Sequence, residues 1–122
     1  MREEAPTITI DENGDKFWRN KEGELHRIDG PAIECSDGDK EWYKMGKLHR
    51  IDGPAVEYKN GDRYWYRKGK LHRIEGPAIE YRNGDKFWYI RDVYFATKEA
   101  FFDSLNDEEK KIAIFSEDFL NA

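Results

Sequence analysis

The segment Leu-His-Arg-Ile-Asp-Gly-Pro-Ala occurs three times in this chain, with Glu for Asp in the last copy. The copies begin at Leu25, Leu48 and Leu71, so that each start lies 23 residues after the one before. A Gly-Asp pair, a basic residue and a tryptophan recur at almost the same interval. Self-similarity at a fixed period of this size is typical of repeat architectures. We therefore expect stacked copies of one small unit. The four tryptophans are Trp18, Trp42, Trp65 and Trp88.

Each unit is predicted to be a β-hairpin. Asn13-Gly14 and its counterparts suit type I′ turns, in which both central residues need a positive φ. The flanking segments alternate in polarity, as strands do. Hydrophobic residues make up only 38% of the chain and charged residues 39%, a low apolar share for two packed layers. The sequence therefore predicts a mainly β fold, a single-layer antiparallel meander of about eight short strands in four hairpin repeats over residues 7–95.

A period of two assigns side chains to the two faces of this sheet. Trp42 and Trp65 point to one face, whereas Tyr43 and Tyr66 point to the other. On the outgoing strands, Ile33, Val56 and Ile79 share a side with Tyr58 and Tyr81, and Glu34, Glu57 and Glu80 take the opposite side. Equivalent residues two strands apart should be roughly 9–10 Å from one another.

The pattern stops after Trp88, and residues 96–122 are predicted to form a helical cap over the open end of the sheet, within one domain of residues 1–122. Thr97 suits the N-cap of a helix that ends at Ser104 or Leu105. Asn106 and Glu109 form a capping box for a second helix that ends near Phe115. Ser116 suits the N-cap of a last turn through Phe119. The residues expected to be buried are Ala100, Phe101, Leu105, Ile112 and Phe115.

Composition excludes several classes of protein. The net charge is −5 with both signs interspersed, so we expect no nucleic-acid binding. Cys35 is the single cysteine, which excludes an internal disulfide and a four-cysteine zinc site and favours a reducing compartment. Residues 1–6 form a polar lead-in unlike a signal peptide. No segment approaches the ~20 apolar residues of a membrane span. We expect a cytoplasmic protein.

The unit from Trp42 to Asp62 resembles the MORN repeat (membrane occupation and recognition nexus), which is also 23 residues long and has an aromatic-turn-Gly-Lys pattern. The chain departs from that family at Arg50-Ile51-Asp52-Gly53-Pro54-Ala55, where it is similar to the Leu-His-Arg-x-Asp-Gly-Pro-Ala repeats of phage and bacterial proteins. The resemblance covers about residues 7–95. It implies an elongated sheet that binds proteins or, in some members, lipid, and it implies no catalytic residues.

Two rows of polar residues recur with the repeat. His26, His49 and His72 would lie too far apart to share one metal ion, so we expect each imidazole to hydrogen-bond its own turn. Each arginine of the motif precedes a carboxylate by two positions, which favours a local ion pair that fixes the turn. The alternative is an arginine row that binds a phosphate or a carboxylate-bearing partner. These arginines are Arg27, Arg50 and Arg73, and the carboxylates are Asp29, Asp52 and Glu75.

The aromatic residues have two interpretations. They stabilise the sheet as cross-strand pairs, or those that the cap leaves uncovered form an exposed patch that binds a partner. Ser104 and Ser116 have no histidine at a suitable spacing, and no phosphate-binding glycine loop occurs, so we expect no catalytic, cofactor or metal site. The candidate partner-binding residues are Trp42, Tyr43, Trp65, Tyr66, Trp88, Tyr89, Arg27, Arg50, Arg73, His49 and His72.

Three functions remain open from the sequence. The leading hypothesis is a non-enzymatic protein-interaction module, and the phage resemblance suggests an inhibitor of a host or defence protein. The alternative is a nucleotide-binding sponge, with bases stacked on aromatic rings and phosphates bound by arginines. Membrane-surface binding is suggested only by the MORN resemblance, and the acidic net charge argues against it. Association of the chain with itself is a further open possibility.

Overall fold

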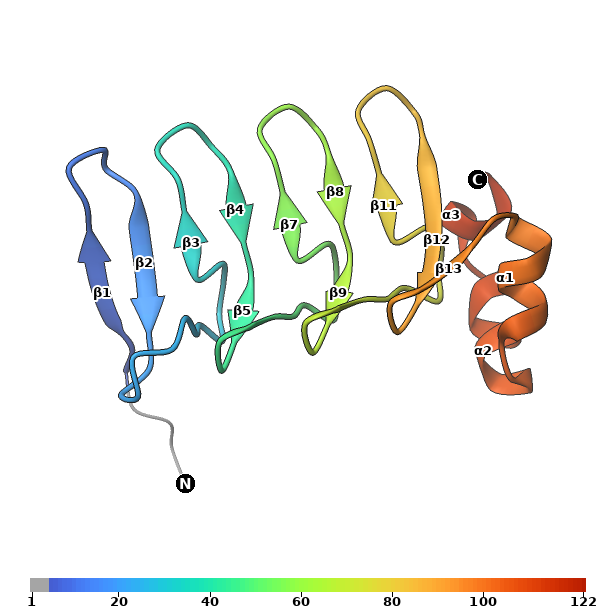
Figure 1. The fold of residues 1–122 in the computed structure, drawn as a ribbon, viewed down its shortest axis with the longest axis horizontal. Coiled ribbons are helices and arrows are strands. Elements are labelled where there is room, and N and C mark those ends of the chain that lie inside the picture. The colour runs from blue at the N-terminus through green and yellow to red at the C-terminus, as the bar shows by residue number, and fades with distance from the viewer. Residues whose placement is uncertain (1–4) are drawn as a thin grey trace.

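The structure, a computed structural model, describes residues 5–122, so the first four residues of the predicted lead-in lie outside it. Thirteen strands lie between Thr7 and Phe95, and three helices follow (Figure 1). The strands are β1 (Thr7–Ile10), β2 (Lys16–Arg19), β3 (Ile33–Glu34), β4 (Lys40–Glu41), β5 (Tyr43–Lys44), β6 (Lys47–Leu48), β7 (Val56–Glu57), β8 (Arg63–Tyr64), β9 (Tyr66–Arg67), β10 (Lys70–Leu71), β11 (Ile79–Glu80), β12 (Lys86–Ile90) and β13 (Val93–Phe95). The helices are α1 (Lys98–Ser104), α2 (Asp107–Ile114) and α3 (Glu117–Leu120).

Nine strands form one open antiparallel sheet in the order β1-β2-β3-β4-β7-β8-β11-β12-β13. Figure 1 shows its four hairpins side by side in a row, with the helices at the end beyond β13. Two further pairs, β5-β6 and β9-β10, lie at the opposite edge from the hairpin tips. The predicted mainly β meander of four hairpin repeats with a helical cap is confirmed.

Both rows of turns depend on left-handed backbone. At the hairpin tips only the glycines, Gly14, Gly38, Gly61 and Gly84, have a positive φ, and the residue before each does not, so the prediction of type I′ turns at the tips is wrong. The second row pairs a non-glycine residue with glycine at Met45-Gly46 and at Lys68-Gly69, with both residues at positive φ, as a type I′ turn requires. After β12 the same turn is made by Arg91 and Asp92, although neither is glycine. The side chain of Asp92 compensates by accepting a hydrogen bond of 2.7 Å from the Leu71 N–H.

Glycine is needed at position 53 for a steric reason and not for its backbone conformation. A positive φ is the obvious reason for glycine at such a position, but Gly53 does not have one. A Cβ atom at Gly53 would lie 2.9 Å from Cζ of Arg50, closer than atoms pack. The residue is small because a guanidinium lies against its backbone. Gly30 and Gly76 meet the preceding arginine in the same way.

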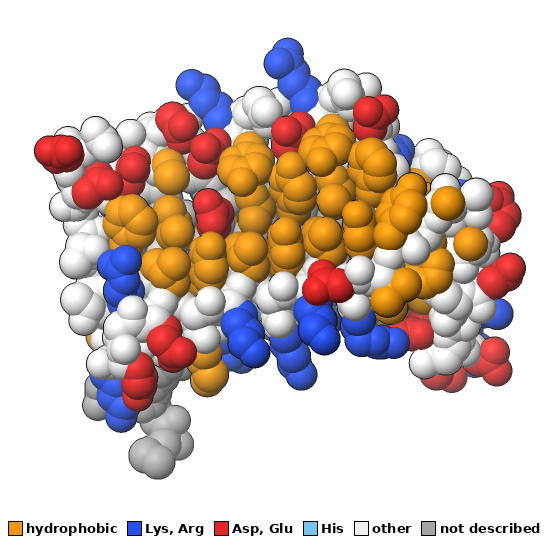
Figure 2. Space-filling view, in the orientation of Figure 1, with side chains coloured by type: hydrophobic (Ala, Val, Ile, Leu, Met, Phe, Trp, Pro, Cys, Tyr) orange, Lys and Arg blue, Asp and Glu red, His pale blue; other side chains and the backbone are white. Residues whose placement is uncertain are grey.

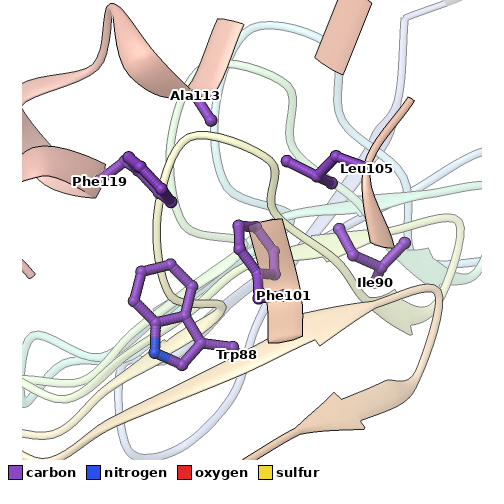
Figure 3. Packing of buried hydrophobic residues seen from close by; sticks show 6 residues of the cluster. All are labelled: Trp88, Ile90, Phe101, Leu105, Ala113 and Phe119. Carbon is purple, nitrogen blue, oxygen red and sulfur yellow. The ribbon is translucent and has the colours of Figure 1, made fainter. Parts of the chain in front are cut away.

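The helical cap packs on the last strands through an aromatic cluster (Figure 3). Phe101 of α1 is fully buried, with its ring centre 4.7 Å from that of Trp88 and 6.3 Å from that of Phe119. Ile90, Leu105 and Ala113 complete this core. The N-cap bond of Thr97 to Ala100 and the capping box of Asn106 and Glu109 are confirmed.

Four predictions about the cap are wrong. Ala100 of α1 is exposed. Ile112 and Phe115 are 49% and 84% exposed, because α2 turns Ala113 towards the core in their place. Ser116 makes no side-chain cap on α3, although α3 does contain Phe119. Its hydroxyl instead donates a hydrogen bond of 2.8 Å to the Glu75 carbonyl, which ties the cap to the third repeat.

Candidate functional site

On one face of the sheet, which we call the tryptophan face, each motif arginine lies over a tryptophan ring. Cζ of Arg50 is 3.8 Å from the centre of the Trp42 ring. The guanidinium is held there by Nε, which donates to Asp52, and by Nη1, which donates to the carbonyl of Pro54 and to Glu57. Arg27 has the same four contacts with Trp18, Asp29, Pro31 and Glu34.

The third arginine departs from this pattern. Arg73 keeps the stack on Trp65 at 3.9 Å and the bonds to Pro77 and Glu80. Its predicted partner Glu75 is exposed, and the ion pair is made instead between Nη2 and Asp118 of α3. The prediction of a local pair is therefore confirmed for Arg27 and Arg50 and wrong for Arg73. No sequence pattern pointed to Asp118, because 45 residues separate it from its partner.

Two grooves run between the arginine loops of the tryptophan face. Groove 1 lies between residues 27–31 and residues 50–52, and Trp42, Lys44 and His49 complete its lining. Groove 2 lies between residues 50–54 and residues 73–75, with Trp65, Arg67 and His72 at the corresponding positions. The predicted candidates Arg27, Arg50, Arg73, Trp42, Trp65, His49 and His72 are thus brought together in these two grooves.

The histidines bind the turn of the next repeat, so the prediction that each binds its own turn is wrong. Nδ1 of His26, His49 and His72 accepts from the backbone N–H of Met45, Lys68 and Arg91, respectively. Burial lowers the pKa of His49 and of His72, and nearby cationic side chains, Arg67 and Arg91 foremost, lower it further. Among residues 5–122, no group of three or more His, Cys, Asp or Glu residues could hold a metal ion.

Trp88 differs from the other tryptophans because the array ends there. Phe101 and Phe119 pack against its ring, and only 7% of the residue is exposed. Trp88 therefore belongs to the core of the cap, although the sequence placed it among the partner-binding candidates.

The opposite face, which we call the tyrosine face, carries a chain of aromatic rings. Tyr58, Tyr64, Tyr81 and Phe87 meet edge to face, with ring centres 5.6–6.0 Å apart. Tyr94 continues the chain to Tyr89 at 5.4 Å. The candidates Tyr43, Tyr66 and Tyr89 are half-buried on this face, as the period of two predicts. Sequence reasoning placed Tyr58 and Tyr81 on one side but did not select them as candidates, and it also missed Tyr64, Phe87 and Tyr94.

This aromatic chain is part of a hydrophobic band that extends along the sheet as far as the cap (Figure 2). In the second hairpin Glu41 stands at the position that Tyr64 and Phe87 take in later repeats, so a carboxylate interrupts the row of rings. Burial raises the pKa of Tyr43 to about 12, and the hydrogen bond that its hydroxyl donates to Glu41 adds to the shift. The pKa of Tyr64 is raised to about 12 by burial and by Tyr81. Tyr43 and Tyr64 are therefore uncharged at neutral pH.

The two edges of the tyrosine face carry opposite charge. The hairpin tips contain mostly carboxylates, and red patches line the upper edge in Figure 2. The second turns of the middle repeats, residues 44–47 and 67–70, contain cationic side chains and no carboxylate, and a blue row lies below the band. The cations of these turns are Lys47, Lys68 and Lys70, together with Lys44 and Arg67, whose side chains also line the grooves of the tryptophan face.

Comparison with known proteins gave no relative: no family model matches the chain, and neither a curated protein nor a solved structure is significantly similar to it. Within residues 5–122, none of the helices has the length and apolar character needed to cross a membrane.

Proposed function

We propose that this chain is a non-enzymatic protein-interaction module that docks its partner on the tyrosine face. The observation that carries the proposal is the aromatic band, which the helical cap leaves uncovered along the repeats. Tyr58 and Tyr94 are 39% and 51% exposed. Large exposed apolar patches mark interaction sites on proteins, and tyrosine is enriched in the buried centre of such interfaces.

The charged edges restrict the chemistry of the partner. A protein that covers the band also meets the cationic edge formed by residues 44–47 and 67–70. Complementary charge steers association and fixes the orientation of the partner. The partner that fits is therefore a protein surface with an apolar ridge, bordered by carboxylates on the side of the second turns.

The biological setting rests on the repeat motif. On the similarity of residues 25–32 and their later copies to phage and bacterial repeats, the proposal extends to inhibition of a host or defence protein in the cytoplasm. An inhibitor of this kind needs a docking surface but no reacting groups, which agrees with the absence of a recognisable catalytic constellation in the sequence.

The nucleotide sponge remains the second candidate, since groove 1 combines an aromatic ring with arginines. The stacks of Arg50 on Trp42 and of Arg73 on Trp65 argue against it. The guanidinium already covers the ring face on which a base would have to stack, so base binding would require the stack to open. Protein docking on the tyrosine face requires no such change.

The test compares two sets of variants as baits for partner capture from a cell lysate, followed by mass spectrometry. Tyr43, Tyr66 and Tyr89 are changed to Ala singly and together, and Arg27, Arg50 and Arg73 are changed to Gln as the control for the opposite face. We expect a captured protein to be lost in steps as tyrosines are removed, with the fold intact by circular dichroism. Capture that survives the triple tyrosine change would overturn the proposal. Calorimetry against a nucleotide panel tests the second candidate directly.

A further inference from the structure

Groove 2 contains a piece of the cap, and groove 1 has no counterpart to it. The two grooves are built from corresponding residues of successive repeats. Groove 2 is also lined by Ile112 of α2 and Asp118 of α3, whereas no cap residue lines groove 1. The cap therefore shows how an acidic segment binds between two arginine loops.

The carboxylate of Asp118 is the main contact of this segment. It pairs with Nη2 of Arg73, and the hydroxyl of Ser116 donates to the carbonyl of Glu75 beside it. The contact covers the arginine: the Arg73 side chain is 8% exposed, compared with 22% for Arg50. The loop carboxylate Glu75 makes no pair with Arg73, and Asp118 binds Nη2 of Arg73, whereas Asp52 binds Nε of Arg50.

Arg50 has a free donor at the corresponding position in groove 1. Its Nε and Nη1 are bonded, but Nη2 has no hydrogen-bond or ion-pair partner among the described residues. No side-chain nitrogen or oxygen in this part of the chain is both buried and unpaired, so Nη2 of Arg50 is accessible to solvent. The stack on Trp42 holds the guanidinium in place, which lowers the entropic cost of binding.

Groove 1 and groove 2 have the same charge before the cap is counted. Arg27, Lys44 and Arg50 line groove 1 with Asp29 and Asp52. In groove 2 the sheet contributes Arg50, Arg67 and Arg73 with Asp52 and Glu75, and this groove holds Asp118 in addition. The arginines of both grooves also pair with strand glutamates, so the further carboxylate is accepted through a hydrogen-bond donor and not through an excess of cations.

We propose that groove 1 is a second binding site, for an acidic segment of a partner protein that presents a carboxylate to Nη2 of Arg50. An aliphatic side chain of the same segment lies against Ile28 and Ile51, which are 71% and 70% exposed at the rim. In groove 2 the corresponding residues of the cap are Asp118, which pairs with Arg73, and Ile112, which lines the same groove as Ile51 and Ile74. The site lies on the tryptophan face, so it does not depend on docking at the tyrosine face.

The probe for this site is a synthetic peptide of residues 106–122, which contains both Ile112 and Asp118. It is titrated into the full-length protein at low salt, and the indole N–H signal of Trp42 is followed by NMR, which detects weak binding. We expect a saturable shift, and an affinity at least ten-fold lower for a peptide with Asp118→Asn. Inorganic phosphate is titrated separately. A phosphate shift equal to that of the peptide would mean a general anion site and would overturn the proposal.

A matched pair of protein variants tests whether the peptide binds in groove 1. Ile28→Glu adds a carboxylate at the rim of groove 1, and Ile10→Glu makes the same change at an isoleucine of β1 that is 63% exposed and lines neither groove. We expect the first variant to lose the peptide by ten-fold or more and the second to bind as the parent does. Equal binding by both variants, or no saturable shift with the parent, would overturn the proposal.

Discussion

Nδ1 of His49 accepts a hydrogen bond of 3.0 Å from the backbone N–H of Lys68, which lies 19 residues further along the chain. The bond joins one repeat to the next and satisfies a donor at the first residue of a left-handed turn. His26 and His72 make the equivalent bonds at 2.9 and 3.1 Å. Because Nδ1 must accept, a protonated imidazole, which has only donors, cannot make this bond.

The first prediction concerns pH. Burial, with the help of nearby cations, lowers the pKa of His49 and His72 in the folded protein. The unfolded chain, with an ordinary histidine pKa of about 6.5, therefore binds more protons as the pH falls below that value. We expect the histidine contribution to the free energy of unfolding to be complete above about pH 6.5 and to be lost progressively below it. Urea unfolding between pH 8 and pH 5 measures the effect.

The control is the double variant His49→Asn and His72→Asn. An asparagine side chain offers an acceptor oxygen near the position of Nδ1, and it does not titrate. We expect its stability to depend less on pH than that of the parent in this range. If both proteins lose the same free energy from pH 7 to pH 5, the histidines are not the source of the pH dependence.

Much of the fold was predictable because the same turn-forming residues recur in each repeat. Asn60-Gly61 and Lys68-Gly69 mark the two turns of one unit, and a period of two between them separates Trp65 from Tyr64 and Tyr66. The aromatic contacts confirm that division. The caps of Thr97 and Asn106 were also readable, because capping depends on residues only three positions apart.

The errors concern contacts between units. Whether His49 reaches its own turn or the next one depends on how the repeats stack, and the sequence of one unit does not contain this information. The same holds for Asp118, whose partner Arg73 is supplied by a loop far away in the sequence. In α2 the apolar residues Ile112, Ala113 and Ile114 are consecutive, so periodicity alone could not show that Ala113 is the one that is buried.

The second prediction tests the close approach of Gly53 to Arg50. In Gly53→Ala the new Cβ would lie 2.9 Å from Cζ of Arg50 and would push the guanidinium off Trp42. We expect a loss of about 1–3 kcal/mol in the free energy of unfolding, the usual range for overpacking. In an Arg50→Ala background the same change should have almost no effect. An equal loss in both backgrounds would refute the steric explanation.

Gly23 and Gly61 provide the comparison for this glycine. Both have a positive φ, of +84° and +104°, and an added Cβ would meet no atom closer than 3.5 Å. Substitution by Ala there is expected to lower the free energy of unfolding by about 1–2 kcal/mol through backbone strain alone. Since no guanidinium is displaced, this loss should persist in the Arg50→Ala background.

The third prediction concerns the cap. Phe101→Ala removes a fully buried ring between Trp88 and Phe119, and we expect a loss of about 3–5 kcal/mol in chemical unfolding. Phe115→Ala, at a residue that is 84% exposed, should change stability by less than about 0.5 kcal/mol. Removal of residues 96–122 should expose the core residues of β12 and cause aggregation, visible by light scattering. A monomeric truncated protein with the stability of the parent would show that the helices are no cap.

The last prediction concerns a row of aspartates at the hairpin tips. Oδ1 of Asp62 accepts a hydrogen bond of 2.7 Å from the backbone N–H of Arg82, in the following hairpin. Asp39 makes the same bond to Lys59, also at 2.7 Å. Asp85 ends the row: among the described residues its side chain bonds only within its own turn, with Asn83. The three residues thus share a motif but differ in whether another hairpin follows.

This difference makes Asp85 the control for the other two. We expect Asp39→Ala and Asp62→Ala each to lower the free energy of unfolding by roughly 1.5–3 kcal/mol, the range for hydrogen bonds to a charged group. Asp85→Ala should have a clearly smaller effect, because it removes no bond between repeats. Urea unfolding of the three variants at pH 7 decides the matter. If all three changes cost the same free energy, the aspartates stabilise only their own turns, and the stacking of the hairpins depends on the sheet and the histidine row alone.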